Sequence, residues 1–91
     1  MKILVLYRPK AEYRQTIEDF ISQYKERYPR SRVEILDVDK REGIAMASIY
    51  DVMRYPSILA LRDDGSVLQT WEGLENMPRL DDVSVYAIDQ L

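Results

Sequence analysis

The chain has 91 residues, of which 46% are apolar and 32% charged, and its formal net charge is −3. These values are typical of a globular protein, so we expect residues 1–91 to form a single domain around one packed core. The acidic balance argues against a nucleic-acid partner, because a nucleic-acid binder needs a basic face to neutralise phosphates. The sequence contains no cysteine and no histidine. These absences exclude a thiol nucleophile, disulfide exchange and the usual zinc ligand sets.

No apolar run is long enough to cross a membrane, and the run after Met1 is too short for the core of a signal peptide. We therefore expect a cytoplasmic protein without a membrane partner. The carboxylates lack the spacing of a calcium-binding loop, and several stand where turns and helix starts favour aspartate. We accordingly expect no metal site and no cofactor.

The first half of the chain predicts a strand, a helix and a second strand. Residues 2–7, KILVLY, form a short apolar run that is typical of a strand buried on both faces. Residues 11–28 place apolar side chains at helical spacing, and Pro29 ends this helix. Residues 32–39, RVEILDVD, predict the second strand. Two strands joined by a helix favour a βαβ unit with parallel strands.

A second helix is predicted over residues 41–53, and Pro56 forbids its continuation. Gly43 weakens the prediction for the first turn of this helix, because glycine has a low helix propensity. Small side chains would let the helix lie close to a sheet, and these are Ala45, Ala47 and Ser48.

The last third predicts a hairpin and a final helix. Residues 57–61 and 67–71 are apolar segments on either side of Asp64-Gly65, where glycine supplies a positive φ at no steric cost. These segments are therefore expected to be antiparallel neighbours, with Trp71 packed under a helix. Residues 78–91 carry an apolar stripe that predicts an amphipathic helix. The stripe consists of Leu80, Val83, Tyr86, Ala87 and Leu91, and either Asn76 or Asp81 is expected to cap the helix.

The predicted order is β-α-β-α-β-β-α, which a four-stranded mixed sheet with helices on both faces accommodates. This order, together with the segment Asp37–Gly73, resembles the thioredoxin fold. Such proteins carry the motif Y-G-V-x-x-x-P-T before an apolar strand and a D-G turn. The matching residues here are Tyr50, Val52 and Pro56, whereas Asp51 replaces the glycine and Ser57 the threonine. Aspartate is one of the few residues that tolerate the left-handed conformation.

The resemblance implies an α/β, thioredoxin-like fold over the whole chain with strand order 2-1-3-4. It also implies that the first and third helices cover one face of the sheet and the second helix the other. In the family the proline that matches Pro56 is cis, and the backbone before it pairs with an extended substrate peptide. We therefore expect a cis bond between Tyr55 and Pro56.

The redox centre of the family is missing from this chain. Aligning the first helices puts Lys10 and Tyr13 where the two cysteines of the family stand, and neither side chain can exchange thiols. The glutathione signature of glutaredoxins is also incomplete, because Tyr55 replaces their threonine or valine and EGLENM lacks their Gly-Gly and aspartate. We therefore exclude thiol–disulfide oxidoreductase activity and expect no catalytic residue.

Three functions remain open. The leading hypothesis is a non-catalytic module that holds a peptide or a partner protein in a groove beside Pro56. The alternatives are a glutathione-binding or glutaredoxin-related enzyme without its own thiol, and a structural assembly subunit that uses a weakly charged free strand edge. The groove is expected to be lined by Arg8, Lys10, Tyr13, Arg54, Tyr55, Pro56 and Gly73.

Two features of this groove have a plainer interpretation. Its tyrosines can fill the vacated redox site and close it. The basic residues near the start of the first helix favour a small anionic ligand, but they can equally form surface ion pairs with nearby acids. These residues are Arg8, Lys10, Arg14 and Arg54.

Overall fold

The computed structural model describes the backbone of residues 1–88 and the side chains through Tyr86. It contains the predicted order of strands and helices, with one additional 3₁₀ helix before the last α-helix. Leu91 and the side chain of Ala87, two members of the predicted apolar stripe, lie outside the described part. The elements are β1 (Lys2–Tyr7), α1 (Arg14–Arg27), β2 (Arg32–Asp37), α2 (Arg41–Ile49), β3 (Ser57–Leu61), β4 (Val67–Glu72), η1 (Leu74–Asn76) and α3 (Leu80–Ile88).

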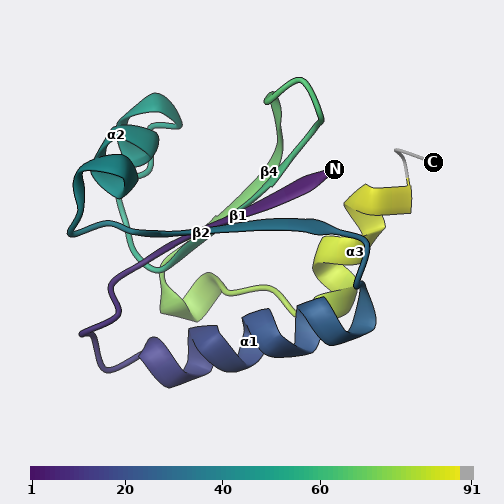
Figure 1. The fold of residues 1–91 in the computed structure, drawn as a ribbon, viewed down its shortest axis with the longest axis horizontal. Coiled ribbons are helices and arrows are strands. Elements are labelled where there is room, and N and C mark those ends of the chain that lie inside the picture. Colours follow the sequence, from purple (N-terminus) through teal and green to yellow (C-terminus); the bar gives the residue numbers. More distant parts are fainter. Residues whose placement is uncertain (89–91) are drawn as a thin grey trace.

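The four strands form one mixed sheet in the order β2-β1-β3-β4, which confirms the predicted topology. β1 runs parallel to β2 and antiparallel to β3, and β3 runs antiparallel to β4. Figure 1 shows α1 and α3 on one side of the sheet and α2 on the other. The long helix α1 makes the parallel β1–β2 pairing possible, because parallel neighbours need a crossover connection. No helix of residues 1–88 is long and apolar enough to cross a membrane.

β1 is buried on both faces, as its continuous apolar sequence predicts. Alternate side chains of a strand point to opposite faces, so β1 contributes to two core clusters. The cluster under α1 and α3 contains Ile3, Val5, Tyr7, Ile17, Ile21, Tyr24, Ile58, Ala60 and Val83. The cluster under α2 contains Leu4, Leu6, Val38, Ala47, Val52, Leu59 and Leu61.

The start of α1 lies later than the sequence pattern indicates. Residues 8–13 form turns, in which Ala11 N–H donates to the Arg8 carbonyl at 3.0 Å and Arg14 N–H to the Ala11 carbonyl at 3.2 Å. The predicted start at residue 11 is therefore wrong by three residues, because turns just before a helix share its spacing over a short stretch.

α2 is shorter than predicted and packs closely for a different reason. It ends at Ile49 rather than at residue 53, because Asp51 adopts the left-handed conformation with φ 60°. A Cβ atom on Gly43 would lie 2.1 Å from the carbonyl oxygen of Asp37, so the close approach to β2 depends on this glycine. Ala47 is buried as expected, whereas Ala45 and Ser48 face solvent.

The hairpin and the last helix follow the predicted pattern with one correction. Gly65 has φ 90°, and Arg62 N–H donates to the Ser66 carbonyl at 2.8 Å to close the turn. Neither Asn76 nor Asp81 caps α3; instead the Asp82 carboxylate accepts the backbone N–H of Arg79 at 2.9 Å. This is the backward bond of a capping box, made from the third residue of the helix. Trp71 of β4 packs edge-on against Tyr86 of α3, with 5.8 Å between ring centroids.

Candidate functional site

The candidate site is built around the peptide bond between Tyr55 and Pro56, which is cis. Pro56 is buried, and its carbonyl accepts the backbone N–H of Gly73 at 2.9 Å. Immediately before it, the N–H and the C=O of Tyr55 form no hydrogen bond with any group in residues 1–88. One backbone donor and one acceptor are therefore left unpaired beside the start of β3, at a half-buried residue.

The segment before Pro56 is held by the end of β4. One carboxylate oxygen of Glu72 accepts the backbone N–H of Met53 at 2.7 Å, and that of Arg54 at a longer 3.4 Å. The hydroxyl of Ser57 donates to the carbonyl of Arg54 from the other side. These bonds hold Met53 and Arg54, and the Gly73 N–H holds Pro56, so the backbone is fixed on both sides of Tyr55 without using the polar groups of Tyr55 itself.

Arg54 and Gly73 form one wall of this region. The Arg54 guanidinium pairs with the Glu75 carboxylate and lies over Gly73, which has φ 88°. The pKa of Glu75 is lowered, first by its own backbone N–H and then by the Arg54 guanidinium. A shallow cleft of about 430 Å³ adjoins this wall and is lined by Arg54, Gln69, Thr70, Trp71, Glu72 and Asn76.

Arg8, Tyr13 and Tyr55 come together on the other wall. The Arg8 guanidinium lies 5.6 Å from the centroid of the Tyr55 ring, and it pairs with Asp39 at 3.1 Å. The backbone N–H of Arg8 donates to the hydroxyl of Tyr13 at 2.9 Å. Tyr55 also packs against the core cluster under α2. Tyr13 packs instead against the cluster under α1 and α3, so Arg8 contacts one tyrosine from each core cluster.

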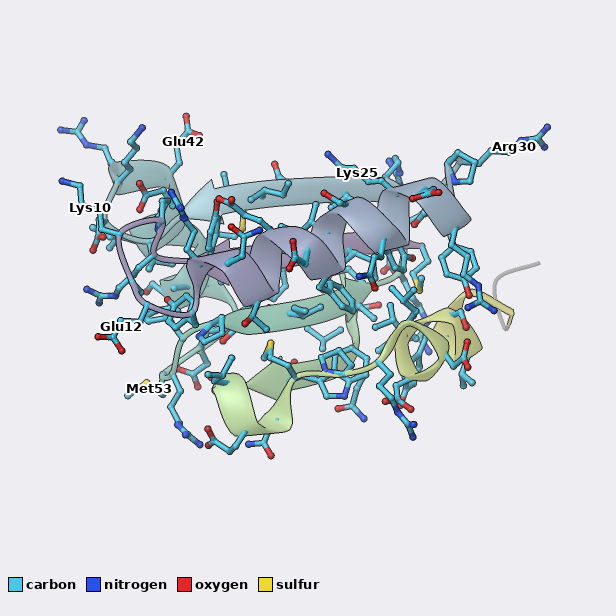
Figure 2. All side chains as sticks on the ribbon, turned by 90° about the horizontal axis from the view of Figure 1, so that it is seen from below. Lys10, Glu12, Lys25, Arg30, Glu42 and Met53 are labelled. Atoms are coloured by element: carbon cyan, nitrogen blue, oxygen red, sulfur yellow. The ribbon has the colours of Figure 1, made fainter. Side chains whose placement is uncertain are left out.

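The predicted basic cluster is partly neutralised by acids. Arg8 is paired with Asp39 and Arg54 with Glu75, whereas Lys10 and Arg14 form no ion pair within residues 1–88. Figure 2 shows Lys10 projecting from the turn before α1, at the same end of the molecule as Met53. In the described part of the chain, no group of three or more acidic residues is arranged to hold a metal ion.

Burial raises the pKa of two tyrosine hydroxyls near this region, those of Tyr13 and Tyr7. For Tyr13, burial is the largest cause of the raised pKa, and it outweighs the hydrogen bond from the Arg8 N–H, which lowers the pKa. Burial also raises the pKa of Tyr7, and the hydrogen bond from its hydroxyl to Glu18, at 3.1 Å, adds to this effect. A neutral phenol is a poor nucleophile, so neither tyrosine replaces the thiolate of a redox centre.

Three acids organise the site, and sequence analysis did not predict their partners. These acids are Asp39, Glu72 and Glu75. The strand predicted over residues 32–39 ends at Asp37, and the chain turns there, with the Asp39 N–H donating to the Asp37 carboxylate at 2.8 Å. Two of these acids could have been predicted from their positions at strand ends, because Glu72 is the last residue of β4 and Asp39 closely follows β2.

Comparison with known proteins gives a structural answer only. No family model matches the chain, and no curated protein does so. Among solved structures, a malarial protein matches with a TM-score of 0.75 and 17% identity, covering 98% of this chain and 94% of that one. Thioredoxin-2, a component of the malaria parasite's protein secretion machinery, matches with a TM-score of 0.76 and 16% identity over 94% of this chain and 80% of that one.

Thioredoxin 1 from the bacterium Thermosipho africanus matches with a TM-score of 0.71 and 16% identity, covering 99% of this chain and 92% of that one. The TM-scores establish a shared fold, and identities this low leave function open. The chain has a thioredoxin-like fold, with four strands in the order 2-1-3-4, and it has no cysteine and therefore no CxxC motif.

Proposed function

We propose that this protein is a non-redox binding module that holds an extended peptide, or an extended segment of a partner protein, beside Pro56. The observation that carries the proposal is the unpaired N–H and C=O of Tyr55. An extended peptide satisfies such a pair by adding itself as a short antiparallel strand, and its backbone then supplies affinity without a fixed sequence.

The rigidity of the segment around Tyr55 supports this proposal. Glu72 holds the preceding N–H groups, and the Gly73 N–H holds the carbonyl of Pro56. The segment does not have to be ordered when the peptide arrives, so less of the interaction free energy is lost to ordering.

The side chains at the edge of the site favour a peptide with apolar residues. Tyr55 offers a half-buried aromatic ring, and tyrosine combines a rigid apolar face with one hydroxyl. Met53 is 80% exposed, and a methionine side chain adapts to partners of different shape. Binding of glutathione has less support, because its carboxylates would compete with Asp39 for Arg8 and with Glu75 for Arg54.

The proposal is tested by following the backbone amide signals of isotope-labelled protein during titration with a pool of unstructured peptides. We expect shifts centred on the amides of Arg54, Tyr55, Ser57 and Gly73. A separate titration with millimolar glutathione shows whether an anionic thiol peptide has the same effect. The absence of shifts at Tyr55 with every peptide would contradict the proposal.

A pair of matched variants locates the site. Met53→Glu places a charge at its edge, whereas Val85→Glu places the same charge on α3, at the other end of the molecule (Figure 2). Both side chains are exposed, so neither change should alter the fold. We expect Met53→Glu to weaken peptide binding by about tenfold, which corresponds to ~1.4 kcal/mol, and Val85→Glu to leave it unchanged. Equal effects of both variants would place binding elsewhere.

A further inference from the structure

The solvent-facing side of α2 is an apolar surface that neither core cluster uses. Ile44 is 57% exposed and Ile49 is 71% exposed, although both are large aliphatic residues. Between them along the helix stand the small exposed residues Ala45 and Ser48. At 3.6 residues per turn, these four side chains occupy an arc of about 140°. α2 lies alone on its side of the sheet, so no element of residues 1–88 covers this arc (Figure 1).

Charged residues of opposite sign stand at the two ends of the arc. Along the helix, Arg41 stands at the N-terminal end and Asp51 follows the C-terminal end. Around the helix axis, Arg41 lies near the middle of the arc. Both are exposed, and neither forms an ion pair within the described residues. Glu42 lies at the margin of the arc, and Figure 2 shows its side chain pointing outward. The surface is thus apolar in the centre, with Arg41 at its N-terminal end, Asp51 at its C-terminal end and Glu42 to one side of Arg41.

We propose that this surface binds a second copy of the chain, with the two α2 helices packed antiparallel about a two-fold axis level with Met46 and Ala47. This inference is independent of the peptide site proposed above. Two-fold pairing requires a surface that is complementary to itself. In this arrangement Ile44 packs over the partner's Ser48, and Ile49 over the partner's Ala45, so that each large side chain meets a small one.

The charges at the ends of the arc select the antiparallel orientation. The antiparallel arrangement brings Arg41 within reach of the partner's Asp51 at both ends of the helix pair, whereas a parallel pair would place like charges together. Helices pack with their axes 8–10 Å apart, and small residues at the contact favour the shorter distance. A second copy therefore fits the shape and the charge of the surface at once.

The dimer should be weak. One nine-residue helix presents less surface than the roughly 800 Å² per partner of a standard stable interface. We therefore expect a dissociation constant in the range of about 10–1000 μM, since small interfaces leave little free energy after the cost of association. Salt should weaken the dimer modestly, because the end pairs are exposed.

The test is sedimentation equilibrium of the full chain across that concentration range, with two variants that carry opposite charges. Ala45→Glu brings two acidic side chains close together in its own dimer, and Ile49→Lys brings two basic ones together. Each variant alone should be monomeric. An equimolar mixture should dimerise again, because the introduced glutamate of one subunit then faces the introduced lysine of the other.

A control and the contradicting outcomes complete the experiment. Val85→Glu changes an exposed apolar residue of α3 and should dimerise like the unaltered chain. A chain that stays monomeric at the highest concentration would overturn the proposal. So would a dimer that both α2 variants retain, because another surface would then be the interface. Loss of the dimer in each variant without recovery in the mixture would overturn the antiparallel pairing.

Discussion

The carboxylate of Glu72 accepts the backbone N–H of Met53 at 2.7 Å and thereby ties the end of β4 to the segment that leads into Pro56. The same oxygen lies 3.4 Å from the N–H of Arg54, which makes a second, weaker bond. A single side chain thus organises a loop that has no regular secondary structure of its own. Its effect on Tyr55 is indirect, because it fixes the two residues before it.

Replacing Glu72 should therefore loosen this loop. We expect Glu72→Ala to lower the free energy of unfolding by about 1 kcal/mol, because a bond from a charged acceptor is lost but water can reach the freed N–H groups. Glu72→Gln retains a carbonyl oxygen that can accept the same hydrogen bonds, so its loss in the free energy of unfolding should be less than half that of Glu72→Ala. Urea unfolding measures both changes.

The amide signals of Met53, Arg54 and Tyr55 show whether the loss is local. Glu12→Ala serves as the control, because Glu12 is an exposed glutamate that points outward in Figure 2. Equal destabilisation by the alanine and glutamine variants would show that Glu72 acts through its charge and not as a hydrogen-bond acceptor.

Gly43 should be intolerant of any side chain. An added Cβ would meet the backbone carbonyl of Asp37 at 2.1 Å, and backbone cannot move aside as a flexible side chain does. We expect Gly43→Ala to destabilise the protein by about 3 kcal/mol or more, through overpacking between α2 and β2.

Ser48→Ala introduces the same residue type on the exposed side of α2 and should change stability by no more than ~0.5 kcal/mol. Thermal and urea unfolding of the two variants give the comparison. A neutral Gly43→Ala variant would mean that α2 packs less closely on β2 than described above.

Local signals were enough to predict the order of strands and helices along the chain. The continuous apolar run of β1, the Asp64-Gly65 turn and the helical spacing before Pro29 each depend on residues close in sequence. The sheet order came from the resemblance to thioredoxins. The left-handed Asp51 was also accessible from sequence, because the position is occupied by glycine in that family.

The contacts within the site could not be predicted in the same way. Arg8 pairs with Asp39, and Arg54 pairs with Glu75. The partners are far apart in sequence, and only the folded sheet brings them together. Gly43 appeared as a weak helix residue, whereas its role depends on where the carbonyl of Asp37 lies in space. Sequence spacing identifies which residue types are present near a site, but it does not say which charges neutralise one another.

Replacing Gly73 tests two possible requirements for glycine at this position: its backbone conformation and the nearby Arg54 guanidinium. Its φ of 88° and ψ of 147° lie in a region that is essentially restricted to glycine, so Gly73→Ala should cost about 1–3 kcal/mol. The added Cβ would also lie 2.7 Å from a guanidinium nitrogen of Arg54.

A double-mutant cycle separates these two causes. If Arg54 contributes, the cost of Gly73→Ala should be smaller in the Arg54→Ala background, and urea unfolding of all four proteins gives the difference. Identical costs in the two backgrounds would assign the whole effect to the backbone and show that the guanidinium simply moves away.

Tyr24 should make the free energy of unfolding decrease as the pH rises through the alkaline range. Its side chain is 2% exposed, its hydroxyl lies 2.9 Å from that of Ser31, and burial raises the pKa of its phenol in the folded state. In the unfolded chain the phenol titrates near its ordinary pKa of about 10. The contribution of Tyr24 is therefore complete below about pH 10 and is lost as the pH rises toward the folded-state pKa, because the unfolded chain releases its proton first.

Comparison with Tyr24→Phe isolates this contribution from those of Tyr7 and Tyr13, whose pKa values are also raised. At pH 7 the variant should be less stable by about 1 kcal/mol, through loss of the hydrogen bond with Ser31. Above about pH 10 the stability difference should shrink, because only the unaltered chain must keep a buried phenol protonated. Urea unfolding at a series of pH values measures it. A difference that stays constant through the alkaline range would show that Tyr24 titrates in the folded protein as it does in water.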